Sequence, residues 1–147
     1  MAKSKYFKSR EEFIEVIDSL IGNMKYHDKV GAAVARAKVV VKFEYSNPEA
    51  SVTVNAKERP SDPKAYFEYS FDETGGPKPD VTFTSSADYA LRFWQGKENA
   101  AMSLATGKLK AKGNPAKALA LLPAIKPTFK IFPKILKEAG REHMIVR

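Results

Sequence analysis

The chain has 147 residues, 44% of them hydrophobic, with 25 basic and 17 acidic residues and no cysteine. The lack of cysteine excludes a disulfide framework, a thiolate metal site and a cysteine nucleophile, and it favours a cytoplasmic location. A chain of this length can bury one hydrophobic core, so we expect a single domain over residues 1–147. No segment approaches the roughly 18 to 20 apolar residues that span a bilayer, and the first residues lack the apolar core of a secretion signal.

The net charge of +8 is concentrated near the C-terminal end of the sequence. Residues 107–147 carry ten basic and two acidic side chains, whereas residues 1–106 carry fifteen of each. This asymmetry predicts either a basic face for an anionic partner, such as phosphates or lipid headgroups, or a solvated face that keeps the protein soluble.

Two helices are predicted before the first strand. Ser9 and Glu12 have the spacing of a capping box, and the apolar residues that follow them fall on one helical stripe. We therefore expect a helix over residues 10–25. The alanine-rich segment 28–36 is predicted to form a second, shorter helix.

From residue 37 onward the hydrophobic pattern changes to the two-residue alternation of strands. Five segments show it, at residues 37–45, 51–57, 65–71, 81–84 and 108–112. Because turn residues separate the first four segments, we expect those four strands to run as an antiparallel meander. Each strand has one apolar and one polar face, which predicts a sheet whose apolar face is covered.

Two short helices are predicted between the fourth and the fifth strand. Ser85 or Ser86 can cap the first, which ends at Gly96. The second spans residues 100–106 and ends at Gly107, a residue that suits the left-handed conformation after a helix.

One more helix follows the fifth strand. Asn114 and Pro115 are suited to its first positions, and we expect it to run through Leu122 and to end at Pro123. The predicted class is therefore α+β: a five-stranded, mostly antiparallel sheet with helices over one face.

The segment 125–139 combines two stripes at helical spacing. The apolar stripe consists of Ile125, Phe129, Phe132 and Leu136, and the basic stripe consists of Lys126, Lys130, Lys134 and Lys137. Pro133 is predicted to kink or divide this helix. A basic amphipathic helix of this kind can lie on an anionic membrane or pack onto the core of its own domain, and the second arrangement is the commoner one.

No catalytic, cofactor-binding or metal-binding motif is found in the sequence. His27 and His143 are too few for a histidine-based metal site, and Gly107 lacks the upstream glycine of a phosphate-binding loop. The aromatic residues of the strands fall mostly on the face that the helices cover, which argues against base stacking. We therefore expect no enzyme, no cofactor, no metal ion and no nucleic-acid partner.

Several short motifs occur in a fixed order between residues 80 and 122. They are the strand Asp80–Thr84, Asp88 and Tyr89 in a helix, Gly96 at the end of that helix, the segment 107–114 with the sequence GKLKAKGN, and an apolar helix through Leu119. In this order they resemble the sterol carrier protein type two family. The helix and strands of residues 10–79 resemble the same family more loosely.

The resemblance implies a hydrophobic tunnel between the sheet and the helices. It implies non-enzymatic binding and transfer of lipid-like ligands, namely fatty acids, acyl-coenzyme A esters, sterols or phospholipids. A long chain would gain about 0.8 kcal/mol for each CH₂ group that it buries in such a tunnel. The apolar residues that we predict to contact the ligand are Phe93, Trp94, Met102, Leu104, Leu119, Leu122, Ile125, Phe129, Phe132 and Leu136.

Two roles remain open for the C-terminal stripes. In the first, the helix gates the tunnel, and Lys126, Lys130, Lys134 and Lys137 dock on an anionic membrane. In the second, the protein is an interaction or regulatory subunit that uses the same fold, with the aromatic stripe as its interface. The expected partner is a hydrophobic small molecule in the first case and another protein in the second. Neither case predicts an oligomeric state.

Overall fold

The computed structural model describes residues 4–147. Its helices are α1 (Arg10–Tyr26), α2 (Asp28–Ala37), α3 (Ala87–Phe93), α4 (Ala100–Thr106), α5 (Pro115–Leu119), α6 (Leu122–Glu138) and the 3-10 turn η1 (Glu142–Met144). Its strands are β1 (Val40–Ser46), β2 (Ala50–Asn55), β3 (Glu68–Phe71), β4 (Val81–Ser86) and β5 (Lys110–Gly113). No helix within residues 4–147 is both long and apolar enough to cross a membrane.

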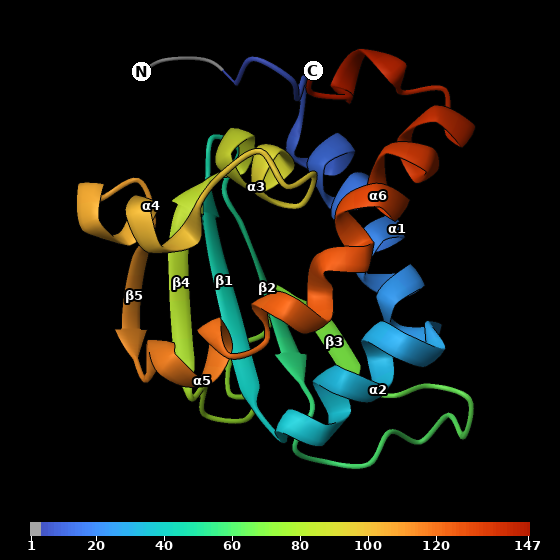
Figure 1. Ribbon diagram of the computed structural model, residues 1–147, viewed down its shortest axis with the longest axis vertical. Coiled ribbons are helices and arrows are strands. Elements are labelled where there is room, and N and C mark those ends of the chain that lie inside the picture. The colour runs from blue at the N-terminus through green and yellow to red at the C-terminus, as the bar shows by residue number, and fades with distance from the viewer. Residues whose placement is uncertain (1–3) are drawn as a thin grey trace.

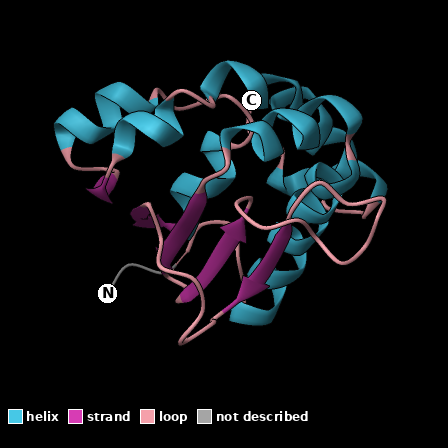
Figure 2. Ribbon diagram, turned by 90° about the horizontal axis from the view of Figure 1, so that it is seen from below, coloured by secondary structure: helices cyan, strands magenta, loops and turns pink. Residues whose placement is uncertain are grey.

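The strands form one sheet in the order β3-β2-β1-β4-β5 (Figure 1). β1–β2, β2–β3 and β4–β5 are antiparallel, whereas β1 and β4 are parallel. Most of the helical ribbon lies on one side of the strands (Figure 2). The α+β class and the five-stranded, mostly antiparallel sheet are therefore confirmed.

The predicted meander of the first four strands is wrong at its last step, because β4 lies beside β1 and not beside β3. Asp80 accounts for this arrangement. Its backbone N–H donates to the carbonyl of Val40 at 2.8 Å, and its carboxylate accepts from the N–H of Val40 at 2.9 Å. These two bonds hold the start of β4 at the start of β1, so the strands run in the same direction. β1 becomes the central strand, buried between two neighbours.

The predicted helices α1 and α2 are confirmed. The Ser9 hydroxyl accepts from the N–H of Glu12 at 3.1 Å, as the capping box requires. His27 separates the two helices and caps the second, since its Nδ1 accepts from the N–H of Lys29 and of Val30. α2 extends through Ala37, so β1 starts three residues later than predicted.

The chain around β3 forms less strand than the alternation predicts. Ala65 and Phe67 are buried, but β3 itself begins only at Glu68. The N–H of Tyr66 donates to the carbonyl of Lys25 at the end of α1, at 2.9 Å. This bond to a helix replaces a bond to the neighbouring strand.

The C-terminal helices differ from the prediction in two respects. α5 ends at Leu119, and Pro123 lies in the first turn of α6, where its missing N–H costs no hydrogen bond. Pro123 therefore begins a helix, although the sequence suggested that it ends one. α6 also continues past Pro133 to Glu138, so of the two predicted effects of this proline, division of the helix is wrong.

Candidate functional site

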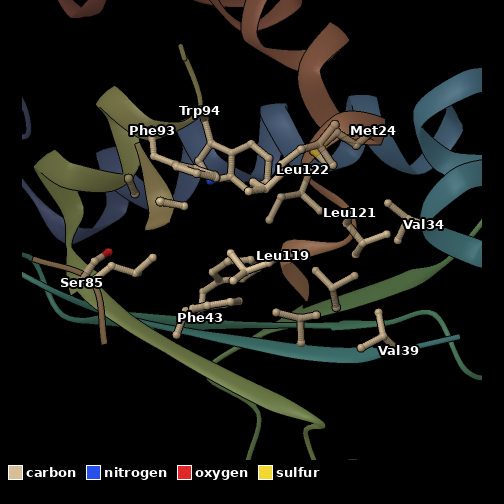
Figure 3. Close-up of a pocket in the computed structure, with 18 of the residues that line it drawn as sticks. Met24, Val34, Val39, Phe43, Ser85, Phe93, Trp94, Leu119, Leu121 and Leu122 are labelled. Atoms are coloured by element: carbon tan, nitrogen blue, oxygen red, sulfur yellow. The ribbon is translucent and has the colours of Figure 1, made fainter. Parts of the chain in front are cut away.

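A cavity of about 100 Å³ lies between the sheet and the helices (Figure 3). Its lining residues are Ile21, Met24, Val34, Val39, Val41, Phe43, Tyr45, Val54, Phe67, Phe83, Ser85, Tyr89, Ala90, Phe93, Trp94, Ala100, Leu109, Leu119, Leu121, Leu122 and Ile125. A water molecule needs only about 10–15 Å³ of such space. The cavity is therefore several times larger than an ordinary packing defect.

The sheet forms the floor of the cavity. Alternation along β1 and the residue before it turns Val39, Val41, Phe43 and Tyr45 toward the helices. Phe43 in β1 and Phe83 in β4 lie directly opposite each other, so their side chains share a face of the sheet, and their ring centroids are 5.9 Å apart. A parallel pair at the centre of the sheet thus supplies a broad aromatic and aliphatic floor.

Two parts of the wall differ in burial. We call the lining residues from α1, α2, β1 and β2, together with Val39 and Phe67, the inner wall; except for the half-buried Phe43, all of them are at most 9% exposed. We call Leu119, Leu121 and Leu122, at the junction of α5 and α6, the outer wall; all three side chains are half-buried. The outer wall is the side of the cavity nearer to solvent.

None of the lining side chains is charged. The polar members are Tyr45, Ser85 and Tyr89. Burial raises the pKa of the Tyr45 hydroxyl well above its usual range, while a hydrogen bond from the Trp94 ring nitrogen opposes the rise. Burial likewise raises the pKa of Tyr89. Both tyrosines are therefore neutral at physiological pH, and the cavity presents an uncharged surface.

The structure brings five of the ten predicted ligand contacts together around the cavity: Phe93, Trp94, Leu119, Leu122 and Ile125. Phe93 and Trp94 come from the end of α3, and their rings are in edge contact at 5.1 Å. Ile125 lies in the first turns of α6, next to the outer wall.

The other five predicted contacts lie outside the cavity wall. Met102 is 65% exposed on α4, and Leu104 packs against a buried cluster that includes side chains of β1, β4 and α3. Phe129 packs on the Phe93 ring at 5.9 Å, and Phe132 and Leu136 are buried among the core residues below α6. Only the first turns of α6 reach the cavity, because the helix then runs along α1 and α2.

Sequence reasoning missed the inner wall as part of the site. Ile21 and Met24 belong to the apolar stripe of α1, and Phe43 and Val54 belong to the alternating faces of the strands. The periodicity marked all four as inward-facing. It could not separate residues that line a cavity from residues that fill a core, since both positions require the same side chains.

The basic stripe of α6 points away from the core. Lys126, Lys130, Lys134 and Lys137 are all exposed. Within residues 4–147, no carboxylate lies within ion-pair distance of any of them, as the ion pairs of the structure involve other cations. The apolar stripe on the opposite face packs onto the core, as the commoner of the two predicted arrangements requires.

The described residues bring together no group of three or more histidine or acidic side chains that could hold a metal ion. The acidic residues that do form contacts have structural partners. Glu12 and Glu15 both bind the guanidinium of Arg141, at 3.5 and 2.8 Å, and so fasten the C-terminal segment to α1.

Comparisons with known proteins agree with this geometry. Comparison with curated proteins gives no match. The fold is similar to the apo form of sterol carrier protein 2 from Yarrowia lipolytica, at 23% identity and a TM-score of 0.55, over 86% of this chain and 95% of that one. It is also similar to sterol carrier protein domain 2 of Helicoverpa armigera, at 20% identity and a TM-score of 0.55, over 88% and 96% of the two chains.

A third similar structure carries the name UbiJ-SCP2, ubiquinone synthesis protein, at 11% identity and a TM-score of 0.56, over 83% of this chain and 95% of that one. At such identities these likenesses show the fold alone. The family match rests on the sequence itself: residues 20–126, which include the whole sheet and the cavity wall, match the SCP-2 sterol transfer family. This chain belongs to that family.

Proposed function

We propose that the protein is a non-enzymatic carrier that binds the hydrocarbon part of a lipid in the cavity and transfers the lipid between membranes or partners. One observation carries the proposal: a cavity of about 100 Å³ is lined by 21 residues, none of them charged. Membership of a sterol transfer family supports the same role. The candidate ligands are fatty acids, acyl-coenzyme A esters, sterols and phospholipids, and the cytoplasmic location expected from the sequence is part of the proposal.

The energetics favour loose specificity for the hydrocarbon chain. Each CH₂ group that enters the cavity contributes about 0.8 kcal/mol, whatever its position along the chain. Pockets for drug-sized ligands hold roughly 300–1,000 Å³, so a long chain must displace part of the wall to enter fully. The outer wall is the part that can move at least cost, because its side chains are only partly buried. The proposed ligand contacts are Phe93, Trp94, Leu119, Leu122 and Ile125.

Contact with an anionic membrane is the second part of the proposal. Lys126, Lys130, Lys134 and Lys137 are exposed on α6, the helix whose first turn adjoins the outer wall. Each such lysine near an anionic bilayer contributes about 1 kcal/mol of attraction at low salt. Docking through this stripe would bring the outer wall close to the lipid that is exchanged.

Native mass spectrometry of the freshly purified protein, with extraction of whatever is bound, tests the proposal. An adduct with the mass of a fatty acid, acyl ester, sterol or phospholipid is the expected result. A bare protein that also ignores an added fluorescent fatty acid would overturn the proposal and favour the interaction-subunit alternative.

A matched pair of variants locates the binding site. Ala90→Leu adds three carbon atoms at a buried position in the cavity wall, and Ala105→Leu adds the same atoms at an exposed position on α4. The first should weaken binding of the fluorescent fatty acid at least tenfold, and the second should leave it unchanged. Equal affinities would mean that ligand binds elsewhere.

A further inference from the structure

A second hollow lies on the surface of the protein. It is formed where α1 meets α2, beside the loop between β2 and β3, which passes α2 in Figure 1. Its volume is about 460 Å³, and its lining residues are Tyr26, Asp28, Pro63, Lys64, Ala65 and Tyr66. None of these residues lines the cavity between the sheet and the helices. We call this hollow the tyrosine groove.

Two hydrogen bonds connect the parts of the tyrosine groove. The hydroxyl of Tyr26, at the end of α1, donates to the carboxylate of Asp62 in the loop at 2.8 Å. The hydroxyl of Tyr66, in the same loop, donates to the carboxylate of Asp28 at the start of α2 at 3.0 Å. Each bond raises the pKa of its tyrosine. Both phenols are therefore protonated at neutral pH, and a carboxylate orients each ring.

The ring of Tyr66 is also fixed by packing. It lies against Gly31 of α2, where an added Cβ atom would come within 2.5 Å of the ring. The backbone N–H of Tyr66 donates to the carbonyl of Lys25 at 2.9 Å. This wall of the groove is thus in place before any ligand arrives, which lowers the entropic cost of binding.

The ring of Tyr26 is open to solvent. Tyr26 is 49% exposed, and Met102 is the other large apolar side chain of the described residues that is exposed. An ammonium group already lies over this ring, since Nζ of Lys25 is 5.5 Å from its centroid. Lys25 pairs with Glu68 at 3.3 Å and does not line the groove, so the face of the ring toward the groove can accept a second cation.

The charges of the groove favour a cation. Asp28 lines the groove and Asp62 adjoins it, whereas Lys64 is the one basic side chain among its described lining residues. The backbone N–H of Lys64, followed by the hydroxyl of Tyr26, lowers the pKa of Asp62, so this carboxylate is charged at neutral pH. Two carboxylates beside two aromatic rings form an unusual surface on a chain of net charge +8.

The hydrogen bonds already present narrow the kind of cation. One oxygen of Asp62 accepts from the hydroxyl of Tyr26, and the other accepts from the N–H of Lys64 at 2.9 Å. A primary ammonium or a guanidinium would bring several N–H donors that compete for these oxygens. A quaternary ammonium has no N–H, and it is attracted by aromatic faces and carboxylates without directed bonds. We propose that the tyrosine groove binds a quaternary ammonium group of the choline type.

Three probes of similar size test the proposal: choline, its uncharged isostere 3,3-dimethylbutan-1-ol, and ethanolamine. Each is titrated while the backbone amide signals of Ala65 and Tyr66 are followed by NMR spectroscopy. Choline should bind with a Kd of about 1–10 mM, and the other two probes should bind at least about fivefold more weakly. Equal binding of choline and its isostere, or choline signals that never saturate, would overturn the proposal. Neither result would touch the carrier function, because the groove lies outside the cavity.

Tyr26 is the decisive position. Tyr26→Leu should weaken choline binding at least about fivefold, whereas Tyr26→Phe, which keeps the ring, should stay within about twofold of the wild type. Both variants should keep the circular dichroism spectrum of the wild type, because the side chain is half exposed. Tyr6→Leu, at a half-buried tyrosine outside the groove, is the matched control and should change nothing. Choline affinity that survives Tyr26→Leu, or that falls equally in Tyr6→Leu, would overturn the proposal.

Free choline and the choline headgroup of a lipid share this chemistry, and Lys64 separates the two sources. Its exposed ammonium repels choline, but it can pair with the phosphate of phosphocholine. Lys64→Gln should therefore tighten choline binding by about two- to threefold and weaken phosphocholine binding by a similar factor. Tighter binding of phosphocholine than of choline by the wild type would identify the headgroup as the source, and the reverse order would identify free choline. A Lys64→Gln variant that binds both probes as the wild type does would contradict a cation in this groove.

Discussion

The inner and the outer wall enclose the same cavity but are built differently. The inner wall belongs to the main core, where α1 packs on the sheet and Phe13, Phe67 and Leu20 are almost completely buried. The outer wall is a junction between the five-residue α5 and the first turn of α6, and its three leucines are half-buried. The comparison indicates that one wall maintains the fold and the other can yield to a ligand. Variants in the two walls should therefore separate stability from ligand exchange.

The largest expected loss of stability comes from the inner wall. Phe67→Ala removes a ring that is 0% exposed and should lower the free energy of unfolding by about 3–5 kcal/mol, since a large cavity remains in a packed core. Urea unfolding followed by circular dichroism measures the change. A loss below about 1 kcal/mol would mean that the inner wall is as adaptable as the outer one.

The next effect concerns Asp80, which connects the start of β1 with Lys57 and with α5. Its carboxylate accepts from the N–H of Val40 in β1 and binds Lys57 at 3.0 Å, and it is 3.8 Å from Lys117 in α5. Asp80→Asn should cost about 1–2 kcal/mol at pH 7, because an amide cannot replace the charge-assisted bonds.

The pH dependence of this variant follows from the sign of the shift. The hydrogen bond from Val40, followed by that from Lys57, lowers the pKa of Asp80 below its ordinary value of 3.8. The stabilisation is therefore complete above about pH 4–5 and disappears as the pH falls through the lowered pKa. The stability difference between wild type and Asp80→Asn should shrink in acid. A difference that stays constant from pH 7 to pH 3 would contradict the role of the charge.

A smaller effect on stability is expected from the outer wall. Leu122→Ala truncates a half-buried side chain and should cost roughly 1 kcal/mol, well below the cost of Phe67→Ala. Its main consequence should be kinetic, with release of a fluorescent fatty acid several times faster in stopped-flow measurements. If release is unchanged while stability falls as much as in the inner wall, the ligand does not leave through this side.

The smallest effect on stability is expected from the basic stripe. Replacing Lys126, Lys130 and Lys134 with glutamine should leave the free energy of unfolding within about 0.5 kcal/mol, because these side chains are exposed and lack ion pairs in the described structure. Transfer of lipid to anionic vesicles should slow, and its dependence on salt should weaken.

A control variant that loses three lysines from another surface tests whether the position of the lysines on α6 matters for lipid transfer. Lys108, Lys110 and Lys112 are exposed in and just before the edge strand β5, and their replacement with glutamine removes the same charge from a different surface. Transfer should respond to the α6 variant more strongly. Equal slowing in both variants would reduce the docking proposal to a general effect of net charge.

The helix starts could be predicted from the sequence because hydrogen bonds between residues close together in the chain form them. Ser9, Ser86 and Asn99 cap α1, α3 and α4 through side-chain hydrogen bonds to residues three positions later, so each helix start is encoded within four residues. Pro123 shows the limit of this reasoning. The same residue can end one helix or begin another, and in the structure Pro123 begins α6, next to Leu121 and Leu122 in the cavity wall.

The candidate site was predictable only in outline. Trp94 and Leu122 lie in the cavity wall, but the equally apolar Phe132 and Leu136 lie in the filled core, and Met102 is exposed. The α6 stripe is continuous in sequence, yet only its first turn reaches the cavity. Beyond its first turns α6 packs on α1 and α2, and no periodicity in the sequence encodes where that change occurs.

The sequence by itself determined the element types, the apolar face of each strand, the basic stripe of α6 and the family. These features rest on capping, on alternation and on residue order, all of which act over short distances along the chain. Only the tertiary structure decided that β4 pairs with β1, that the outer wall is partly exposed, and that Phe132 and Leu136 lie in the filled core and not in the cavity wall. Each of these depends on contacts between residues far apart in sequence, where many side chains compete for the same space.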